Sequence, residues 1–106
     1  STLTACGNDF NFKYIFSRNL EALGVKKDLL ITLSTSGNSQ NIIEVLKVAR
    51  KKKISSLSFL GFNGGKAKKY SNLNLVVAST NVARIQEAHL FLGHFILNEV
   101  EKKLIN

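Results

Sequence analysis

The sequence predicts an α/β fold, a three-layer α/β/α sandwich in which helices cover both faces of a parallel sheet. Short apolar runs at 29–33, 54–62 and 73–78 have the length of strands. Between them lie segments whose apolar residues recur at helical spacing. Because strands that alternate with helices are joined by crossover connections, we expect the sheet to be parallel.

The first predicted helix begins close to the N-terminus. Asp9 is a suitable N-cap, and Gly24 is expected to end the helix. Between these two residues an apolar stripe recurs at helical spacing, and we expect it to face the core. The stripe consists of Phe12, Ile15, Phe16, Leu20 and Leu23.

The first predicted strand, 29–33, is a nearly continuous apolar run. Such a run is typical of a strand whose two faces are both covered, as in parallel sheets. We therefore expect this strand to be buried.

A loop of six small residues, Ser34 to Ser39, leads from this strand into a helix that runs to about Lys53. Gly37 allows a backbone conformation that other residues resist, and Ser39 is a natural N-cap. The first N–H groups of a helix lack intrahelical partners and attract anions. Three serines and one threonine, without a lysine or a carboxylate, favour a phosphate monoester as the anion. The alternative is a serine-rich turn that only caps the helix.

The remaining elements follow in order. Residues 54–62 form the second predicted strand, the polar segment 63–72 holds one helical turn, and 73–78 form the third strand. The last helix is expected from near Asn81 to Lys103. In parallel sheets ligands bind at the carboxyl ends of the strands, so the loops that follow the strands are the expected site.

The segment from Gly61 to Lys66 resembles a nucleotide-binding P-loop because it follows a strand and contains Gly-Lys. Its glycines are one residue too close, and Ala67 stands where a P-loop has a Ser or Thr that binds magnesium. We interpret the segment as a turn that needs glycine dihedral angles.

The last helix carries Gln86, His89 and His94 within an otherwise apolar run. A helix that is apolar around its whole circumference is buried on several sides, and in a chain of 106 residues this predicts a subunit interface. A single histidine on such a helix is commonly a hydrogen-bonded core residue. Gly93 would allow another backbone to approach closely.

Composition fits one domain over residues 1–106, with 44% hydrophobic residues and no linker. No apolar run is long enough to span a membrane, so we expect no membrane association. The single Cys6 favours the reducing cytoplasm. The chain has no methionine and only three predicted strands, and we expect it to be part of a longer protein whose N-terminal elements complete the sheet.

The net charge of +8 raises the possibility of nucleic-acid binding. The lysines cluster at predicted helix ends and turns, where they complement the helix dipole or remain in water. Because no aromatic residues interleave with them, we expect no nucleic-acid partner.

Several motifs together resemble one family, the phosphoheptose isomerases, which contain a sugar isomerase (SIS) domain with a flavodoxin-like or Rossmann-like sheet. The segment Thr35-Ser36-Gly37-Asn38-Ser39 with Asn41 is similar to the phosphate-binding signature of SIS domains. The other matches, in chain order, are Gly7-Asn8-Asp9, Gly64-Gly65-Lys66, Arg84-Ile85-Gln86-Glu87 and His94. Family members are roughly twice this length, which implies that this chain corresponds to their C-terminal part.

The resemblance implies roles for particular residues. His94 matches the catalytic histidine, and Gln86 with His94 match two ligands of a zinc ion, one per subunit, whose other ligands, a His and a Glu, have no counterpart here. Eight residues on one helix span about 12 Å, which makes joint chelation by these two side chains difficult. His89 is the alternative, because it lies three residues from Gln86 and so on the same face of the helix, but the family match favours His94. The substrate-binding residues implied are Asn8, Asp9, Ser34, Thr35, Ser36, Ser39 and Gln86.

The function implied is an aldose–ketose isomerase that converts sedoheptulose 7-phosphate to D-glycero-D-manno-heptose 7-phosphate for lipopolysaccharide biosynthesis, in a cytoplasmic homotetramer. A buried histidine is expected to be one acid/base partner, since the ordinary pKa of histidine, about 6.5, lies near neutral pH. The alternatives are a non-catalytic SIS domain that binds a sugar phosphate, and a paralogue that associates with the replication initiator. That paralogue resembles the chain at Gln86-Glu87 but lacks a histidine at the position of His94.

Overall fold

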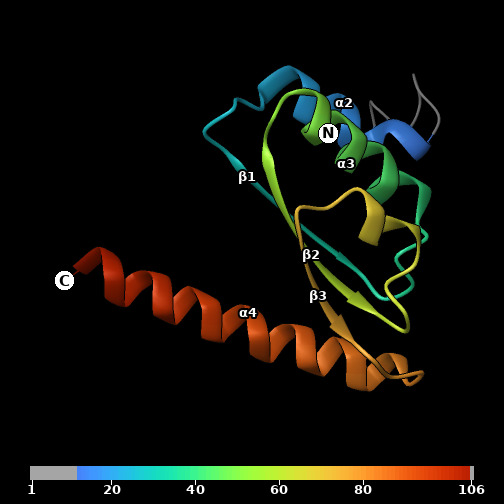
Figure 1. Ribbon diagram of the computed structural model, residues 1–106, viewed down its shortest axis with the longest axis vertical. Helices are drawn as coiled ribbons and strands as arrows, with labels where there is room; N and C mark the ends of the chain where they lie inside the picture. The colour runs from blue at the N-terminus through green and yellow to red at the C-terminus, as the bar shows by residue number, and fades with distance from the viewer. Residues whose placement is uncertain (1–11, 106) are drawn as a thin grey trace.

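The computed structural model describes residues 12–105, which form a three-stranded parallel sheet with helices on both faces (Figure 1). This confirms the predicted α/β architecture. Every element predicted from residue 12 onward is present. The expectation that Asp9 caps the helix ending at Leu23 is wrong, because a 3₁₀ turn precedes that helix and Tyr14 occupies its N-cap position. The elements in chain order are η1 (Phe12–Tyr14), α2 (Ile15–Leu23), β1 (Leu29–Ser34), α3 (Gln40–Lys51), β2 (Ser55–Gly61), η2 (Lys66–Lys69), β3 (Leu73–Val77) and α4 (Val82–Ile105).

The three strands lie in the order β1-β2-β3, and both pairs are parallel. In this register Leu33 is the neighbour of Phe59, and Phe59 is the neighbour of Leu75. The carboxyl ends of all three strands therefore meet at one edge of the sheet. The loop after each strand opens at that edge.

Two adjacent residues of β2 show which helix packs on each face of the sheet. Successive side chains of a strand point to opposite faces of the sheet. Leu60 packs in a buried cluster with Leu46 of α3, whereas the ring of Phe59 meets His89 of α4 edge to face, with ring centres 5.7 Å apart. Thus α3 covers one face of the sheet and α4 covers the other (Figure 1).

Buried hydroxyl groups run across the face of the sheet beneath α3. The hydroxyl oxygens of Thr32 and Ser58 lie 2.6 Å apart, and Ser58 also hydrogen-bonds Ser71, which follows η2. All three residues are buried. Because a buried polar group without a partner is destabilising, this chain of hydrogen bonds constrains how β1, β2 and the segment after η2 can align.

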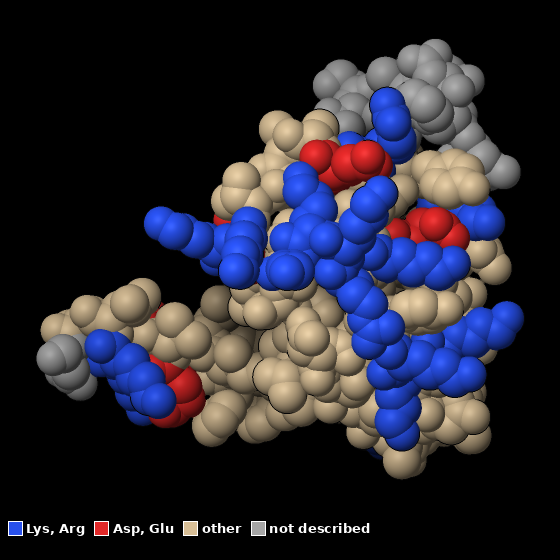
Figure 2. Space-filling model, turned by 45° about the horizontal axis from the view of Figure 1, so that its top comes forward, with Lys and Arg blue, Asp and Glu red and all other residues tan. Residues whose placement is uncertain are grey.

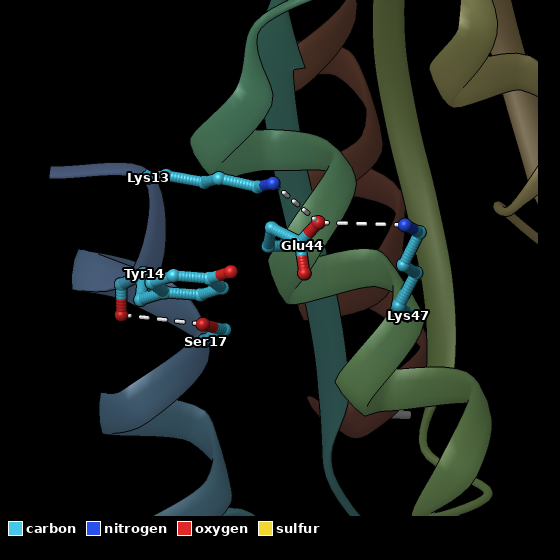
Figure 3. A network of polar contacts seen from close by, with 5 residues as sticks. All are labelled: Lys13, Tyr14, Ser17, Glu44 and Lys47. Atoms are coloured by element: carbon cyan, nitrogen blue, oxygen red, sulfur yellow. Dashed lines mark hydrogen bonds and ion pairs between the residues drawn. The ribbon is translucent and has the colours of Figure 1, made fainter. Parts of the chain in front are cut away.

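The helix α2 packs on α3 rather than directly on the centre of the sheet (Figure 1). A polar network joins the start of this region to α3: Glu44 lies 3.8 Å from the ammonium of Lys13 and 3.4 Å from that of Lys47 (Figure 3). Within the same turn the hydroxyl of Ser17 donates to the carbonyl of Tyr14. These contacts fix the outer layer of the sandwich.

The expectation that the whole apolar stripe of the first helix faces the core is wrong. Ile15 is buried, but Phe12, Phe16 and Leu23 are exposed. The reason is that α2 rests on α3 near the free edge of β1, where the described chain provides nothing to cover the far side of the helix. The expected end of this helix is confirmed, because the helix ends at Leu23 and Gly24 is its C-cap.

The expectation that the first strand is covered on both faces is also wrong. Leu29, Ile31 and Leu33 are 57%, 47% and 59% exposed. They lie on the face that α4 covers elsewhere, but α4 packs on β2 and β3 and leaves this part of β1 open. In the described chain β1 is an edge strand, so its continuous apolar pattern was not sufficient evidence of burial.

The helix α4 packs on the sheet only through its first half, where Ile85 and His89 are buried. Its second half projects beyond the sheet (Figure 1). Large apolar residues along it are exposed, namely Leu90, Phe91, Phe95, Leu97, Val100, Leu104 and Ile105. Among the described residues, no helix combines the length and apolar character that crossing a bilayer requires.

Candidate functional site

The loop between β1 and α3 is folded by its own hydroxyl groups. The side-chain oxygen of Ser34 accepts a hydrogen bond from the N–H of Gly37 at 3.0 Å and lies 3.4 Å from the hydroxyl of Ser39. The side-chain oxygen of Ser36 accepts from the N–H of Asn38 at 3.1 Å. The loop is therefore a tight turn held by internal contacts.

Ser39 occupies the N-cap position of α3, as predicted, but its hydroxyl does not cap the helix. Its carbonyl oxygen accepts from the N–H groups of Ile42 and Ile43. The N–H groups of Gln40 and Asn41 make no hydrogen bond to any other described residue. Such unpaired N–H groups at a helix start are suited to bind an anion.

The glycine-containing loop after β2 supports the serine loop from behind. The N–H of Ala67 donates to the carbonyl of Gly37 at 2.8 Å, and the N–H of Lys66 donates to the side chain of Asn38 at 2.9 Å. Gly37 has a φ of +69°, and a Cβ atom built there would lie 2.1 Å from the carbonyl oxygen of Gly64. Only glycine fits between the two loops.

The interpretation of Gly61 to Lys66 as a glycine-dependent turn is confirmed. Gly64 and Gly65 have φ values of +92° and +58°. Both lie in the left-handed region that favours glycine. The turn contributes to the site by holding the serine loop in place.

An open pocket of about 560 Å³ lies between the serine loop and α4. Ser34, Thr35 and Ser39 line one side of it, and Gln86 lines the other side together with the buried His89. Apolar walls come from Leu33 and Leu90. The tertiary structure thus brings Gln86 next to hydroxyl groups that lie about fifty positions earlier in the sequence.

His89 is held in one orientation by two contacts. Its Nε2 atom lies 2.7 Å from the carbonyl oxygen of Leu60, and because a carbonyl can only accept, Nε2 carries the proton and donates. The ring also packs edge to face on Phe59. The second ring nitrogen, Nδ1, takes no part in the bond to Leu60. His89 is among the residues that line the pocket.

His94 lies elsewhere. Its side chain is exposed, and it is not among the residues that line the pocket. Five helical positions separate it from His89, a rotation of about 140°, so the two rings leave different sides of α4. The expectation of a buried histidine at position 94 is wrong for the described chain, because His94 lies on a different side of α4 from the buried residues Ile85 and His89. Its acid/base role stays a prediction.

The described residues do not fit a zinc ion by themselves. Within residues 12–105 no three His, Cys, Asp or Glu side chains gather as a metal site requires. Gln86 lines the pocket, but His94 does not. Of the two ligands predicted in this chain, the structure brings only Gln86 to the pocket, and the zinc site stays a prediction.

Three other predicted site residues need comment. Asn8 and Asp9 lie outside the described residues. Ser36 is half-buried, and it is absent from the pocket lining because its hydroxyl engages the backbone of Asn38. Ser34, Thr35 and Ser39 do line the pocket, and their role in binding phosphate stays a prediction.

His89 was the second choice in the sequence, after His94, because it follows Gln86 by three residues and so shares its side of the helix. The structure places His89, and not His94, in the pocket with Gln86. Asn38 was not expected to connect the two loops. No sequence pattern identified that contact, because its partner, Lys66, lies on a different loop.

Comparison with characterised proteins shows strong similarity to one group. Over 102 residues the chain is 49% identical to the phosphoheptose isomerase of Campylobacter concisus, a match that covers 96% of this chain and 54% of that protein. Over 104 residues it is 46% identical to the phosphoheptose isomerase of Clostridium acetobutylicum, covering 98% and 53%. The chain thus spans about half the length of these relatives. No protein-family model matches it.

Solved structures show the same similarity in three dimensions. The phosphoheptose isomerase of Neisseria gonorrhoeae superposes with a TM-score of 0.88 at 39% identity, over 92% of this chain and 55% of that one. The phosphoheptose isomerase of Francisella tularensis also gives a TM-score of 0.88, at 34% identity, over 92% and 52%.

Proposed function

The chain is related to the phosphoheptose isomerases and matches their C-terminal part, and from this relationship we propose that it forms the phosphate-binding portion of an aldose–ketose isomerase. The proposed reaction interconverts sedoheptulose 7-phosphate and D-glycero-D-manno-heptose 7-phosphate, for lipopolysaccharide biosynthesis in the cytoplasm. We propose further that residues 1–106 belong to a single SIS domain that the rest of the protein completes.

The observation that carries this proposal is the pocket shared by the serine loop and α4. Ser34, Thr35 and Ser39 line this pocket, and Ser39 directly precedes the unpaired N–H groups at the start of α3. Such a set of neutral donors is suited to a phosphate group. Gln86, on the opposite wall, is then positioned to contact the sugar portion of the same substrate.

The chemistry proposed is a proton shuttle between neighbouring carbons. A general base removes a proton from the carbon next to the carbonyl, an enediol or enediolate forms, and an acid returns a proton to the other carbon. We propose His94 as one acid/base partner and a glutamate outside this chain as the other. No step of this proposal uses a metal ion.

Because His94 is exposed in the single chain, this mechanism requires another part of the protein to bring substrate to it. The second half of α4, which carries His94, is not covered by any described element and is largely apolar. We therefore propose that α4 packs against other copies of the protein in a homo-oligomer, for which a tetramer is predicted. His94 would meet substrate only in that assembly.

One observation favours a second candidate function. The described pocket is lined by hydroxyl groups suited to phosphate, but the predicted catalytic histidine is not part of it. A domain that binds a sugar phosphate without converting it, as a regulatory signal, would need only these groups. Conversion of sedoheptulose 7-phosphate by the intact protein would eliminate this candidate.

The test compares hydroxyl groups that line the pocket with one that does not. In the intact protein, Thr35→Val and Ser39→Ala should each weaken binding of sedoheptulose 7-phosphate about 10- to 100-fold, the usual effect of losing a hydrogen bond to a charged group. Ser36→Ala is the matched control and should weaken it less, because Ser36 bonds the loop backbone. Calorimetry gives the affinities, and NMR follows the isomerisation. Equal affinities in all four proteins would contradict the proposed site.

A further inference from the structure

A second polar pocket, of about 240 Å³, lies at the opposite end of β2 from the serine loop. Its lining includes Arg50, Lys53, Ser55, Tyr70 and Asn72. Ser55 is the first residue of β2, and the strand ends six residues later, so about 20 Å of strand separates this pocket from the edge that carries the candidate site. The two pockets share no residue.

The free polar groups of this pocket are hydrogen-bond donors or hydroxyls. The side-chain oxygen of Asn72 already accepts from the N–H of Ser56 at 2.8 Å, which leaves the NH₂ group of its amide available. The hydroxyl of Ser55 and the ammonium of Lys53 make no contact with another polar group in the described chain. No Asp or Glu among the described residues lines the pocket. Such a set of groups is complementary to an anion.

Arg50 is held in place at the side of this pocket. Its guanidinium carbon lies 6.0 Å from the centre of the Tyr70 ring, and one of its N–H groups donates to the carbonyl of Lys69 at 3.3 Å. A guanidinium has five N–H groups, so this single bond leaves most of them free. Its position beside an aromatic ring reduces the entropy that it would lose on binding an anion.

Lys53 adopts a backbone conformation that is unfavourable for lysine. Its φ is +61°, and it is the C′ residue of a helix end in which Ile54 donates to Ala49 and Lys53 donates to Arg50. Glycine is the usual residue at this position. Arg50 and Lys51 already provide cations in the last turn of α3, so the helix dipole does not require a further lysine here. Lys53 lines the pocket.

The layer formed by α3 and η2, which contributes Arg50 to the pocket, is strongly positive. Residues 40–72 contain eight Lys or Arg and one Asp or Glu, so this segment contributes +7 of the net charge of +8. Figure 2 shows Lys and Arg side chains gathered over the layer formed by α3 and η2. A field of this sign raises the local concentration of anions.

We propose that this pocket is a second anion site, which binds a small molecule through a phosphate group. Its volume is below the roughly 300–1,000 Å³ typical of sites for larger ligands, so it fits a phosphate with at most a small polar substituent. Arg50 and Lys53 neutralise the charge, while Ser55 and Asn72 orient the oxygens. Such a ligand would act at a distance from the isomerase site.

The probe for the test is inorganic phosphate, titrated into the intact protein at constant ionic strength. Amide NMR shifts resolve the two sites by residue, with Ser55 and Asn72 reporting on this pocket and Gly37 on the serine loop. Saturable shifts are expected at Ser55 and Asn72. Lys53→Gly should weaken binding there about 10- to 100-fold and leave binding at Gly37 unchanged.

Two further variants separate the pocket from general electrostatics. Lys51→Gln removes the same charge from an exposed position nearby that does not line the pocket, and it should change the affinity less than threefold. Lys53→Arg should retain binding. Equal weakening by Lys53→Gly and Lys51→Gln, or no saturable shift at Ser55, would overturn the proposal. The proposal would also be overturned if a single-stranded DNA oligonucleotide caused NMR shifts at Ser55 and Asn72 and inorganic phosphate did not.

Discussion

The Nε2 atom of His89 lies 2.7 Å from the carbonyl oxygen of Leu60 and joins α4 to the central strand. The bond is buried and lies beside the pocket that we propose binds the substrate. It holds one wall of that pocket, which includes Gln86, at a set distance from the sheet. This single contact therefore links the stability of the fold to the shape of the site.

Replacing His89 should destabilise the fold. In His89→Phe the ring keeps its contact with Phe59, but the carbonyl of Leu60 loses a buried donor, which lowers the free energy of unfolding by about 1–3 kcal/mol. Urea denaturation of the intact protein measures the change. Lys51→Phe, at an exposed position of α3 and outside α4, is the control and should stay within about 0.5 kcal/mol of the original protein.

Replacing His94 should affect the rate rather than the fold. His94→Gln keeps a similar volume and hydrogen-bonding capacity, so the intact enzyme should fold and bind substrate normally while the isomerisation slows about 10²- to 10⁴-fold. His89→Gln is the control and should lower stability more than rate. Normal turnover by the His94 variant would show that another group is the acid or base.

The contact between the two loops predicts that Gly37 cannot be replaced. Gly37→Ala places a Cβ against the carbonyl of Gly64 and forces alanine into a left-handed conformation, and unfolding should become easier by at least about 1–2 kcal/mol. Sugar-phosphate binding should weaken with it. Gly37→Asn separates the two causes, because Asn tolerates the φ value but still introduces the Cβ. If Gly37→Asn behaves like the original protein, the close approach of the loops is not as described.

The exposed half of α4 predicts an oligomer. Leu97 is 66% exposed, so Leu97→Asp should leave the fold of one chain intact and reduce the mass of the assembly in sedimentation. Asn98→Asp adds the same charge next to it, at an exposed polar residue, and is the control. Among residues 12–105, a Cβ at Gly93 meets only the ring of Phe59, at 3.8 Å, so dissociation caused by Gly93→Ala would report a contact with another copy. A monomeric intact protein would contradict the prediction.

The left-handed conformation of Lys53 predicts an unusual gain of stability. Lys53→Gly should raise the free energy of unfolding by about 1 kcal/mol, because glycine adopts this φ without strain. Lys51→Gly, two residues earlier in the last turn of α3, should lower it by about the same amount. Thermal denaturation of both variants provides the comparison. A loss of stability in Lys53→Gly would mean that the lysine side chain supports the fold.

Local patterns in the sequence determined the elements and their order. Apolar periodicity located each helix and strand described here, because burial on one side imposes that period on the chain. The turn residues were equally informative. Gly24, Gly64 and Gly65 were expected to end a helix or form a turn, since only glycine adopts their conformations or allows their close contacts. Ser39 marked the start of α3 for a similarly local reason.

The tertiary structure alone decided which of these local features meet. Gln86 and His89 reach the serine loop because α4 crosses the carboxyl ends of β2 and β3, whereas His94 lies on a side of α4 that does not line the pocket. A continuous apolar run does not distinguish a central strand from the edge strand β1, because both have the same local pattern. Burial and contact depend on residues that are distant in the chain, and a pattern read within one segment contains no information about them.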